Sequence, residues 1–506
     1  MLFSAYSFLL VFLPLLLVAR HYTRNWGAER LCFLLLLFSL AFYAVGGGVF
    51  LLFLGLMVCV NYAFAQSIVP PVANIGAAPL VDDAAERLPR KRLLTLAVIC
   101  NLVPLVGYKY AAFLGNSLAA LLGADWHFAG HAMPPGISFV TFIQIAWLVG
   151  VYQGKFVPNG LGRHALFSSF FPYVISGPIV RYEELGAQFD NLAPASPDML
   201  ARGVAMFCVG LAKKVLLADS LAVYANAVFN GADRAFPLTT AEAWMGSLCY
   251  SFQLYFDFSG YTDMALGLGL MLGLQLPQNF NSPYKATGIV EFWRRWHITL
   301  STWLRDFLYI PLGGNRAGRL KQYRNLLLTM IIGGAWHGAG WLFLVWGALH
   351  GAMLCINHFF RIVIKGTRLA ATLSLLPFRL LFIALTFFCI NFCWVVFRAT
   401  TLEGAGRIYK AMFAGPLVAD GADGTLMGIM PNHYCNDWQG IALLALSAVI
   451  VWAFPSSQEI FHGKEDGSRA WLSFEPNTRW AVALALVTCA SLFMAARQAT
   501  FLYFQF

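Results

Sequence analysis

Charged residues are scarce in this chain: only 11% of its 506 residues are charged, whereas 59% are hydrophobic. An ordinary soluble domain is about one quarter charged, so this chain lacks the polar surface needed to face water on all sides. The runs 31–65 and 93–114 are almost wholly apolar, and about 20 apolar residues cross a bilayer as a helix. A β-barrel is disfavoured because its strands would be about ten residues long with alternating polarity. We predict an all-α polytopic membrane protein.

Sequence motifs for metals, nucleotides and disulfides are missing as well. The ten cysteines have no CxxC spacing and lie mostly in apolar runs, which favours small core residues over disulfides or zinc ligands. His433, Cys435 and Asp437 lie close together, but we interpret this lone cluster as part of a loop. Neither a glycine-rich phosphate loop nor a GxSxG elbow occurs. We therefore expect no metal ion and no tightly bound cofactor.

The chain has a net charge of +10, and its basic residues lie between the apolar runs. This arrangement indicates the positive-inside rule rather than nucleic-acid binding. The N-terminal stretch lacks a basic region and a small-x-small cleavage site, so we interpret it as a retained first span with its N-terminus outside. A tight turn at 46–48 would separate the second and third spans. Three basic loops then fall on the cytoplasmic side, carrying Arg20, Arg24 and Arg30; Arg87, Arg90, Lys91 and Arg92; and Lys155 and Arg163.

The rest of the chain also divides into apolar and irregular stretches. Further spans are predicted at about 134–153, 200–228, 241–274, 326–360, 373–398, 438–454 and 480–496. Residues 164–185 and 276–324 are too polar or too rich in glycine and proline to span simply. Irregular backbone survives in a membrane only where protein or a water-filled cavity satisfies it, so we expect re-entrant or interfacial structure there. No internal repeat is visible, and we predict one integral-membrane domain over 1–506 with its motif-bearing core at about 134–360.

The segment "FWRRWHITLSTWLRDF", residues 292–307, is unusually rich in charge and aromatic rings. On a continuous helix, its tryptophans and leucines share one face and its arginines occupy the opposite one. Such a helix is suited to the membrane–water boundary. His297 falls on the apolar side, close to Trp293, and so turns toward the protein. From this segment alone, an anchoring helix with a histidine that only hydrogen-bonds in the core is the simpler interpretation.

A second histidine lies in "IIGGAWHGAGWLFLVWGALHG". His337 would sit within an apolar span, where an ionisable group is costly and indicates a functional site. A stripe of small residues lets another helix approach closely; it consists of Gly333, Gly340, Gly347 and Gly351. His350 is a rival, but on one continuous helix it could not share a face with His337. A neutral imidazole in an apolar cavity suits a general base, and a cationic patch at its mouth suits a phosphate-bearing donor.

At these residues the sequence resembles the membrane-bound O-acyltransferase family, and within it the bacterial alginate O-acetyltransferase branch. The matching stretches cover most of 134–351, including "FFPYVISGPIVRYEEL", "FDFSGYTDMALGLGLMLGLQLPQNFNSPYKATGIVEFWRRWHITLSTWLRDFLYIPLGGNR" and "GGAWHGAGWLFLVWGALHG". The resemblance implies a ring of tilted transmembrane helices, with re-entrant or interfacial helices, around a central funnel. It also implies that His337 matches the essential histidine of the family and His297 its second polar position.

The same resemblance implies roles for further residues. Cavity or second-sphere candidates are Asp257, Ser259, Tyr261, Asp263 and Trp336, and for the two aspartates helix–helix hydrogen bonding is an equally good explanation. Weaker candidates for donor binding are Arg294, Arg295 and Arg305, which positive-inside anchoring also explains.

The implied reaction is acetyl transfer from acetyl-CoA, used as a co-substrate, to an exopolysaccharide. His337 would act as general base or become acetylated itself, and His297 would orient the acceptor or polarise the carbonyl. The resemblance places the protein in the bacterial inner membrane, in contact with lipids and with periplasmic acetyltransferase partners. Two alternatives stay open: a teichoic-acid D-alanyl transferase and, in a different class, a transporter or export channel, against which the absence of an inverted repeat counts.

Overall fold

A computed structural model describes residues 2–70, 84–316, 318–416, 437–463, 467–468 and 470–495. Every regular element in these ranges is a helix, which confirms the prediction of an all-α protein. The chain forms two compact units, one of Met1–Phe207 with Met264–Pro277 and one of Cys208–Asp263 with Gln278–Phe506. A single domain over the whole chain, and a ring around a funnel, remain predictions.

The first unit contains η1 (Ser7–Phe12), α1 (Leu13–Tyr22), α2 (Ala28–Gly47), α3 (Phe50–Ile68), α4 (Ala84–Leu105), η3 (Val106–Tyr110), α5 (Ala111–Leu122), α6 (Ile137–Tyr152), α7 (Leu161–Ser169), α8 (Tyr182–Asp190) and most of α9 (Pro197–Ala212). The second contains η4 (Lys213–Ala218), α10 (Asp219–Asp233), most of α11 (Thr240–Met271), η5 (Pro283–Lys285), α12 (Ile289–Arg295), α13 (Ile298–Leu304), η6 (Arg305–Tyr309), α14 (Arg319–His337), α15 (Trp341–Ile364), α16 (Arg368–Leu373), α17 (Leu376–Arg398), α18 (Leu402–Ala414), α19 (Asp437–Ala453), α20 (Ser457–His462) and α21 (Thr478–Met494).

Several of these helices are built to cross a membrane. Within the described residues, five are long and apolar enough: α2, α3, the continuous helix Arg87–Leu122, α15 and α17. Gly48 separates α2 from α3 with a φ of +51°, a conformation that glycine adopts without steric cost, so the predicted tight turn is confirmed. The protein is therefore a multi-pass membrane protein.

The two stretches predicted not to span are irregular, as expected. Residues 164–185 form the short helices α7 and α8 with buried, non-helical backbone between them. Residues 276–324 hold only short helices until α14 begins at Arg319. These stretches contain most of the non-helical backbone that is buried in protein, the condition under which it is tolerated at membrane depth.

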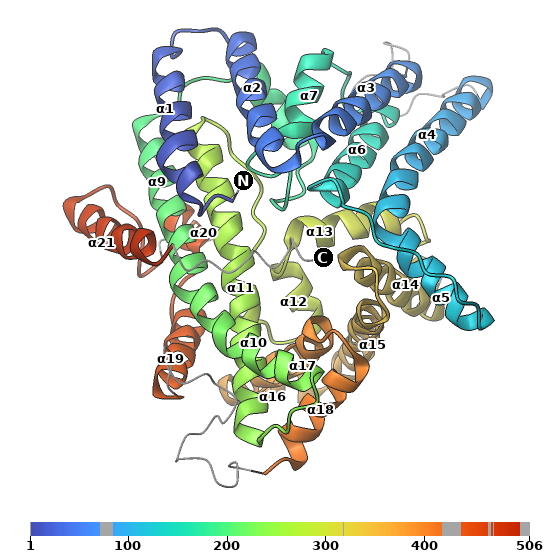
Figure 1. Cartoon of the computed structure of the whole chain (residues 1–506), viewed down its shortest axis with the longest axis vertical. Coiled ribbons are helices and arrows are strands. Elements are labelled where there is room, and N and C mark those ends of the chain that lie inside the picture. Colours follow the sequence, from blue (N-terminus) through green and yellow to red (C-terminus); the bar gives the residue numbers. More distant parts are fainter. Residues whose placement is uncertain are drawn as a thin grey trace. The chain divides into compact units, whose positions relative to one another are not determined.

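The predicted span 326–360 is wrong as one helix. It is a helical hairpin, in which α14 ends at His337 and α15 begins at Trp341, and the two helices lie side by side (Figure 1). A Cβ atom on Gly334 would lie 2.2 Å from the Phe343 carbonyl oxygen, and one on Gly347 would lie 2.3 Å from that of Met330. Of the predicted small-residue stripe, Gly347 and Gly351 therefore lie where the two arms of this hairpin meet, whereas Gly333 faces Leu304 and Gly340 has no close contact with α14.

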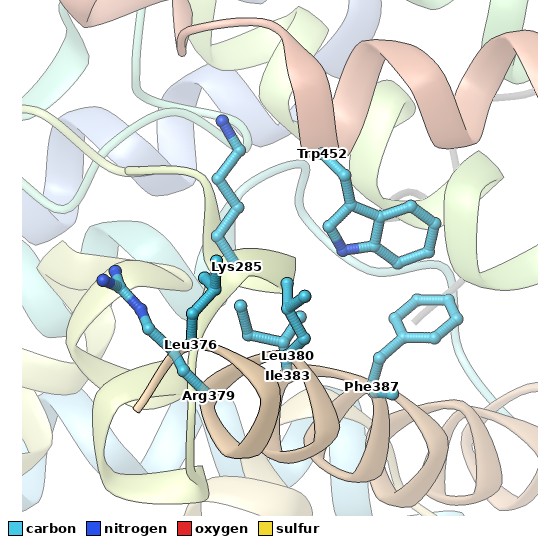
Figure 2. Close-up of a pocket in the computed structure, with 8 residues that line it drawn as sticks. Lys285, Leu376, Arg379, Leu380, Ile383, Phe387 and Trp452 are labelled. Carbon is cyan, nitrogen blue, oxygen red and sulfur yellow. The ribbon is translucent and has the colours of Figure 1, made fainter. Parts of the chain in front are cut away.

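Aromatic rings form much of the core of the second unit. Trp394 of α17 donates its indole N–H to the Tyr284 hydroxyl at 3.1 Å, and its ring lies 5.1 Å from Trp296 and 5.9 Å from Trp346. At the edge of this core, Phe387 of α17 meets Trp452 of α19 edge to face, with centroids 5.0 Å apart (Figure 2). These large rings bury more apolar area than any other side chains and so fix the helices that carry the histidines.

Candidate active site

His297 lies at a break between two short helices, not within one. α12 ends at Arg295, α13 starts at Ile298, and His297 itself has a left-handed backbone with a φ of +43°. Our expectation of one continuous helix over 292–307 is therefore wrong. The predicted faces still hold, because Trp293, Trp296 and Trp303 are buried while Arg294 is exposed.

The break is held by Asn279, which is fully buried. Its backbone carbonyl accepts the N–H of Ile298 at 2.9 Å. Its side-chain Oδ1 accepts the N–H and the hydroxyl of Thr299, at 3.2 Å and 2.9 Å. The same Oδ1 lies 3.1 Å from Nδ1 of His297. Asn279 therefore caps α13 and anchors the histidine ring with one side chain, which explains why the chain leaves the helical path here.

This contact determines the tautomer of His297. A backbone N–H can only donate, so the Asn279 atom facing Thr299 must be the carbonyl oxygen, and the Nδ1 atom that shares it must carry the proton. The ring is fully buried, and burial lowers the pKa of His297 to about 3. At neutral pH the ring is therefore uncharged, and its Nε2 atom is the one with an available lone pair.

His337 lies at the C-terminal end of α14, just before the turn of the hairpin, and only 5% of its surface is exposed. Aromatic rings enclose it, with centroids 5.0 Å away for Trp336, 5.1 Å for Trp346 and 5.3 Å for Phe397. A helix end carries backbone carbonyls without intrahelical partners, so this position is less apolar than the middle of a span. The sequence therefore predicted its burial correctly but its place in the helix wrongly.

Trp336 joins the two histidines. Its ring lies 5.0 Å from that of His337 and 6.2 Å from that of His297, which also packs edge to face against Phe258 at 4.7 Å. The structure thus brings His297, Trp336 and His337 into one buried cluster. Each imidazole packs against this one indole ring, and a neutral imidazole can accept a proton or a hydrogen bond from a hydroxyl group, which is the chemistry expected of the two histidines.

His350 belongs to the same cluster, contrary to our expectation. Because the predicted span is a hairpin, His350 on α15 and His337 on α14 both pack on Trp346, at 4.6 Å and 5.1 Å. Trp293 donates its indole N–H to Nδ1 of His350 at 3.2 Å, so the proton of the neutral ring is on Nε2.

Comparison with known proteins identifies the family of this chain. Residues 149–397 match the membrane-bound O-acyltransferase family. The chain is 43% identical to the probable alginate O-acetylase AlgI of Azotobacter vinelandii over 419 residues, 82% of this chain and 78% of that protein. The corresponding protein of Pseudomonas aeruginosa is 42% identical over 82% of this chain and 75% of its own length. The chain belongs to the membrane-bound O-acyltransferase family. The peptidoglycan O-acetyltransferase of Helicobacter pylori is 38% identical, over 81% of this chain and 80% of that protein.

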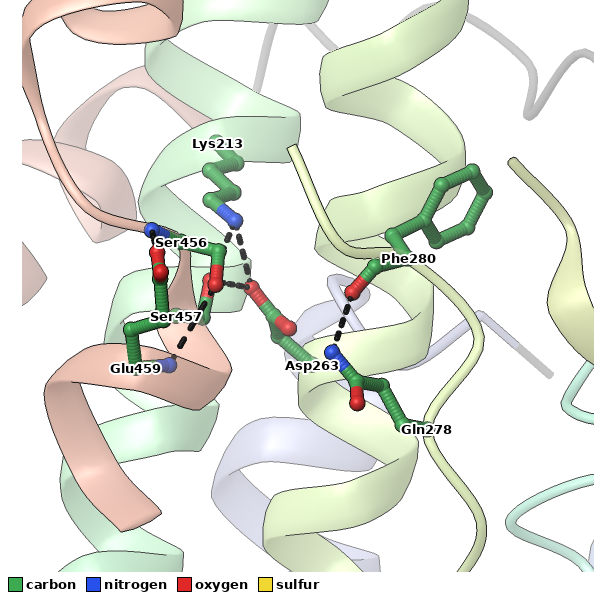
Figure 3. Close-up of polar contacts among 7 residues, drawn as sticks. All are labelled: Lys213, Asp263, Gln278, Phe280, Ser456, Ser457 and Glu459. Carbon is green, nitrogen blue, oxygen red and sulfur yellow. Dashed lines mark hydrogen bonds and ion pairs between the residues drawn. The ribbon is translucent and has the colours of Figure 1, made fainter. Parts of the chain in front are cut away.

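In this acyltransferase the two aspartates of α11 are held in buried ion pairs. Asp263 lies 2.6 Å from the Lys213 ammonium and accepts the Ser457 hydroxyl at 2.6 Å (Figure 3). Asp257 lies 2.8 Å from Lys214, which also pairs with Asp219 at 2.7 Å. These contacts join α11 to η4 and α20, and they support the helix–helix explanation of both aspartates. Ser259 and Tyr261 are buried on the same helix.

The three candidate donor-binding arginines of the acyltransferase differ in their partners. Arg295 pairs with Glu291 at 2.8 Å, and Arg305 pairs with the adjacent Asp306 at 2.6 Å. Arg294 is exposed, and within the described residues its guanidinium has no ion pair. Arg294 is therefore the one whose charge is least compensated. His433 and Cys435 lie outside the described residues.

Asn279, Phe258 and Trp346 were not among the site residues predicted from the sequence. Asn279 stands in an irregular stretch, "LPQNFNSPY", where periodicity carries no information about neighbours. A buried asparagine needs partners, but only the fold shows that one of them is His297.

Proposed function

We propose that this protein takes acetyl groups from cytoplasmic acetyl-CoA and passes them across the inner membrane for O-acetylation of an exopolysaccharide of the alginate type, together with a periplasmic partner protein. The single observation that carries this proposal is the convergence of His297 and His337 on Trp336 in a buried cluster. Additional support comes from the family membership and from relatives described as O-acetylases.

The two histidines would have separate roles. His337 removes the proton from the attacking hydroxyl, whose oxygen bonds to the thioester carbonyl carbon. The carbon–sulfur bond then breaks, and the CoA thiolate leaves and takes up a proton. Alternatively, His337 is the first acceptor of the acetyl group and passes it on. His297 accepts a hydrogen bond through Nε2, because Asn279 holds its proton on Nδ1, and so orients the acceptor.

The charge of the donor explains why this reaction needs a protein in the membrane. The phosphates of CoA are anionic and cannot cross hydrocarbon, whereas the acetyl group is small and neutral. A protein that holds the thioester on one side and releases acetyl on the other moves only that group. Relatives described as a probable alginate O-acetylase and as a peptidoglycan O-acetyltransferase support a polysaccharide as the acceptor.

The direct test is CoA release by the purified protein incubated with acetyl-CoA labelled in the acetyl group. Replacement of His337 by alanine should lower the release rate at least about 1,000-fold, as expected when the base or nucleophile itself is lost. His358→Ala is the matched control, because His358 lies on the same hairpin but near the far end of α15; it should leave the rate within about twofold.

Size-exclusion profiles and melting temperatures of both variants establish that they fold. A folded His337→Ala protein that releases CoA at the wild-type rate would contradict the proposal. Absence of CoA release by the wild-type protein would instead favour the transporter, which moves its substrate without acetyl-CoA. Preference for a D-alanyl thioester over acetyl-CoA in the same assay would instead favour the D-alanyl transferase.

A further inference from the structure

Two grooves flank α17 in the second unit, and one residue lines both. The first groove, of about 500 Å³, lies between α17 and Trp452 of α19. The second, of about 660 Å³, lies between α17 and α15. Arg379, in the first turn of α17, borders each of them. Neither groove includes His297 or His337, so both are distinct from the candidate active site.

The positions of the lining residues on α17 show how the grooves are related. The first groove is lined on this helix by Leu376, Leu380, Ile383, Ala384 and Phe387, and the second by Phe382, Leu385, Thr386 and Cys389. At 100° per residue these two sets are centred about 150° apart around the helix, with Arg379 between them. The grooves thus run along two flanks of one helix and meet at one arginine.

Cationic groups gather at that meeting point. Figure 2 shows Lys285 and Arg379 at one end of the first groove and the rings of Phe387 and Trp452 at the other. Arg361, in the last turn of α15, lines the second groove. Because α15 and α17 pack against each other, the end of one and the start of the next place Arg361 and Arg379 at the same membrane boundary.

The two arginines at the meeting point are not compensated by the protein, whereas the negative charge of Glu459 acts on Lys285. Within the described residues, neither Arg361 nor Arg379 has an ion pair or a side-chain hydrogen bond. Lys285 donates one of its three N–H groups to the Phe454 carbonyl at 2.6 Å. The one carboxylate that lines either groove is that of Glu291, which is already paired with Arg295 at 2.8 Å. The meeting point therefore carries a net positive charge beside two apolar grooves.

We propose that one anionic diacyl phospholipid binds astride α17, with its phosphate at Arg379 and Arg361 and one acyl chain in each groove. Both volumes lie within the range of about 300–1,000 Å³ that ligand pockets occupy. Basic pockets between membrane helices bind anionic lipid headgroups, and guanidinium groups pair with phosphate in a bidentate manner. A single-chain donor such as a CoA thioester would explain one groove and leave the other without a role. This site does not depend on the proposed function.

The test measures which lipid stays on the protein. Wild-type protein is reconstituted in vesicles of equal amounts of phosphatidylethanolamine and phosphatidylglycerol, re-purified in mild detergent, and its retained lipids are quantified by mass spectrometry. We expect phosphatidylglycerol to predominate on the wild type. The double variant Arg361→Gln/Arg379→Gln should retain about tenfold less of it, because two cations near the phosphate are lost.

The matched control is Lys365→Gln/Arg368→Gln, which removes the same charge from neighbouring residues that line neither groove. It should retain the wild-type amount. A second variant, Ala384→Trp, fills the first groove while keeping both arginines; Ala384 is exposed, so the larger ring does not disturb the core. This variant should also retain less phosphatidylglycerol than the wild type.

Two outcomes would overturn the proposal. One is equal retention of phosphatidylglycerol by the wild type and the double variant; a raised KM for acetyl-CoA in that double variant would then make these arginines part of the donor site. The other is equal retention of the two lipids by the wild type, which would mean that no headgroup is recognised.

Discussion

Nδ1 of His297 lies 3.1 Å from Oδ1 of Asn279, and that oxygen also caps the helix that follows the histidine. One amide side chain therefore sets the backbone break, the ring orientation and the tautomer together. Asn279 resembles the outer-sphere partners that orient metal-binding histidines. Removal of such a partner typically lowers metal affinity or activity about 10- to 100-fold. The relationship makes Asn279 a positioning residue of the candidate site.

Replacing Asn279 by leucine should lower kcat for CoA release about 10- to 100-fold, because the proton of His297 is no longer held on Nδ1. Asn279→Asp keeps an acceptor oxygen and should retain more activity than the leucine variant, while its negative charge raises the pKa of His297. A merely structural role predicts that both variants lose melting temperature and activity in parallel. Gln278→Leu, which changes the neighbouring side chain, is the control, with kcat within about twofold of the wild type.

The low pKa of His297, about 3, predicts a dependence of stability on pH. An unfolded histidine titrates near pH 6.5, so between these values the unfolded chain binds a proton that the folded chain does not. The neutral ring therefore makes its full contribution to the free energy of unfolding above about pH 6.5. That contribution is lost as the pH falls toward 3, by up to about 1.4 kcal/mol per pH unit. Melting temperatures from pH 7.5 to 5 should therefore fall less steeply for His297→Gln than for the wild type. Equal slopes would show that His297 is already charged or exposed.

The sequence predicted the residue ranges of many helices but not every break between consecutive helices. The α6, α11, α17, α19 and α21 helices match predicted apolar runs closely, because about 20 apolar residues in a row admit few structures other than a helix. The hairpin at Gly338–Gly340 was missed because the run 326–360 is apolar on both sides of it. Composition cannot distinguish one long span from two packed helices when the linker is itself apolar.

For the candidate site, too, the sequence predicted individual residues but not the contacts between distant segments. His337 was identified because an ionisable group in an apolar span is costly, and His297 because the resemblance matches it to the second polar position of the family. The burial of both side chains is confirmed. Their common neighbour Trp336 had been named only by resemblance. Asn279, Trp346 and the inclusion of His350 depend on contacts between distant segments, and a single sequence contains no record of those contacts.

Close packing in the hairpin predicts a contrast between two glycines. A Cβ on Gly347 would lie 2.3 Å from the Met330 carbonyl oxygen, whereas the nearest atom to a Cβ on Gly340 would be 3.6 Å away. Gly347→Ala should force α14 and α15 apart, at a cost of about 1–3 kcal/mol, and lower CoA release because His337 moves with α14. Gly340→Ala should leave both melting temperature and rate near the wild type. Equal behaviour of the two variants would mean that the hairpin is not packed through Gly347.

Uncompensated charge predicts which arginine contributes to donor binding. Arg294 has no ion pair in the described part of the chain, whereas Arg305 pairs with Asp306 at 2.6 Å. Arg294→Gln should therefore raise KM for acetyl-CoA about threefold to tenfold with little change in kcat, since an exposed ionic contact contributes about 1 kcal/mol. Arg305→Gln should change KM less than twofold. Steady-state kinetics at low ionic strength measure both values, and an unchanged KM in Arg294→Gln would remove Arg294 from the donor-binding candidates.

Substitutions in the buried ion pair of Lys213 and Asp263 can distinguish a structural role of Asp263 from a catalytic one. Their side chains are 14% and 7% exposed, so Asp263→Asn leaves the ammonium of Lys213 without its charge partner, at a cost of about 3–5 kcal/mol. Adding Lys213→Met removes that ammonium and should restore most of the melting temperature. If Asp263 only joins helices, the double variant should also release CoA at the wild-type rate per folded molecule. A double variant that regains stability but stays inactive would show that the carboxylate or the ammonium takes part in the reaction, because these two groups are the ones that it lacks. Activity of the single variant Lys213→Met, which keeps the carboxylate, would then assign the role to Asp263.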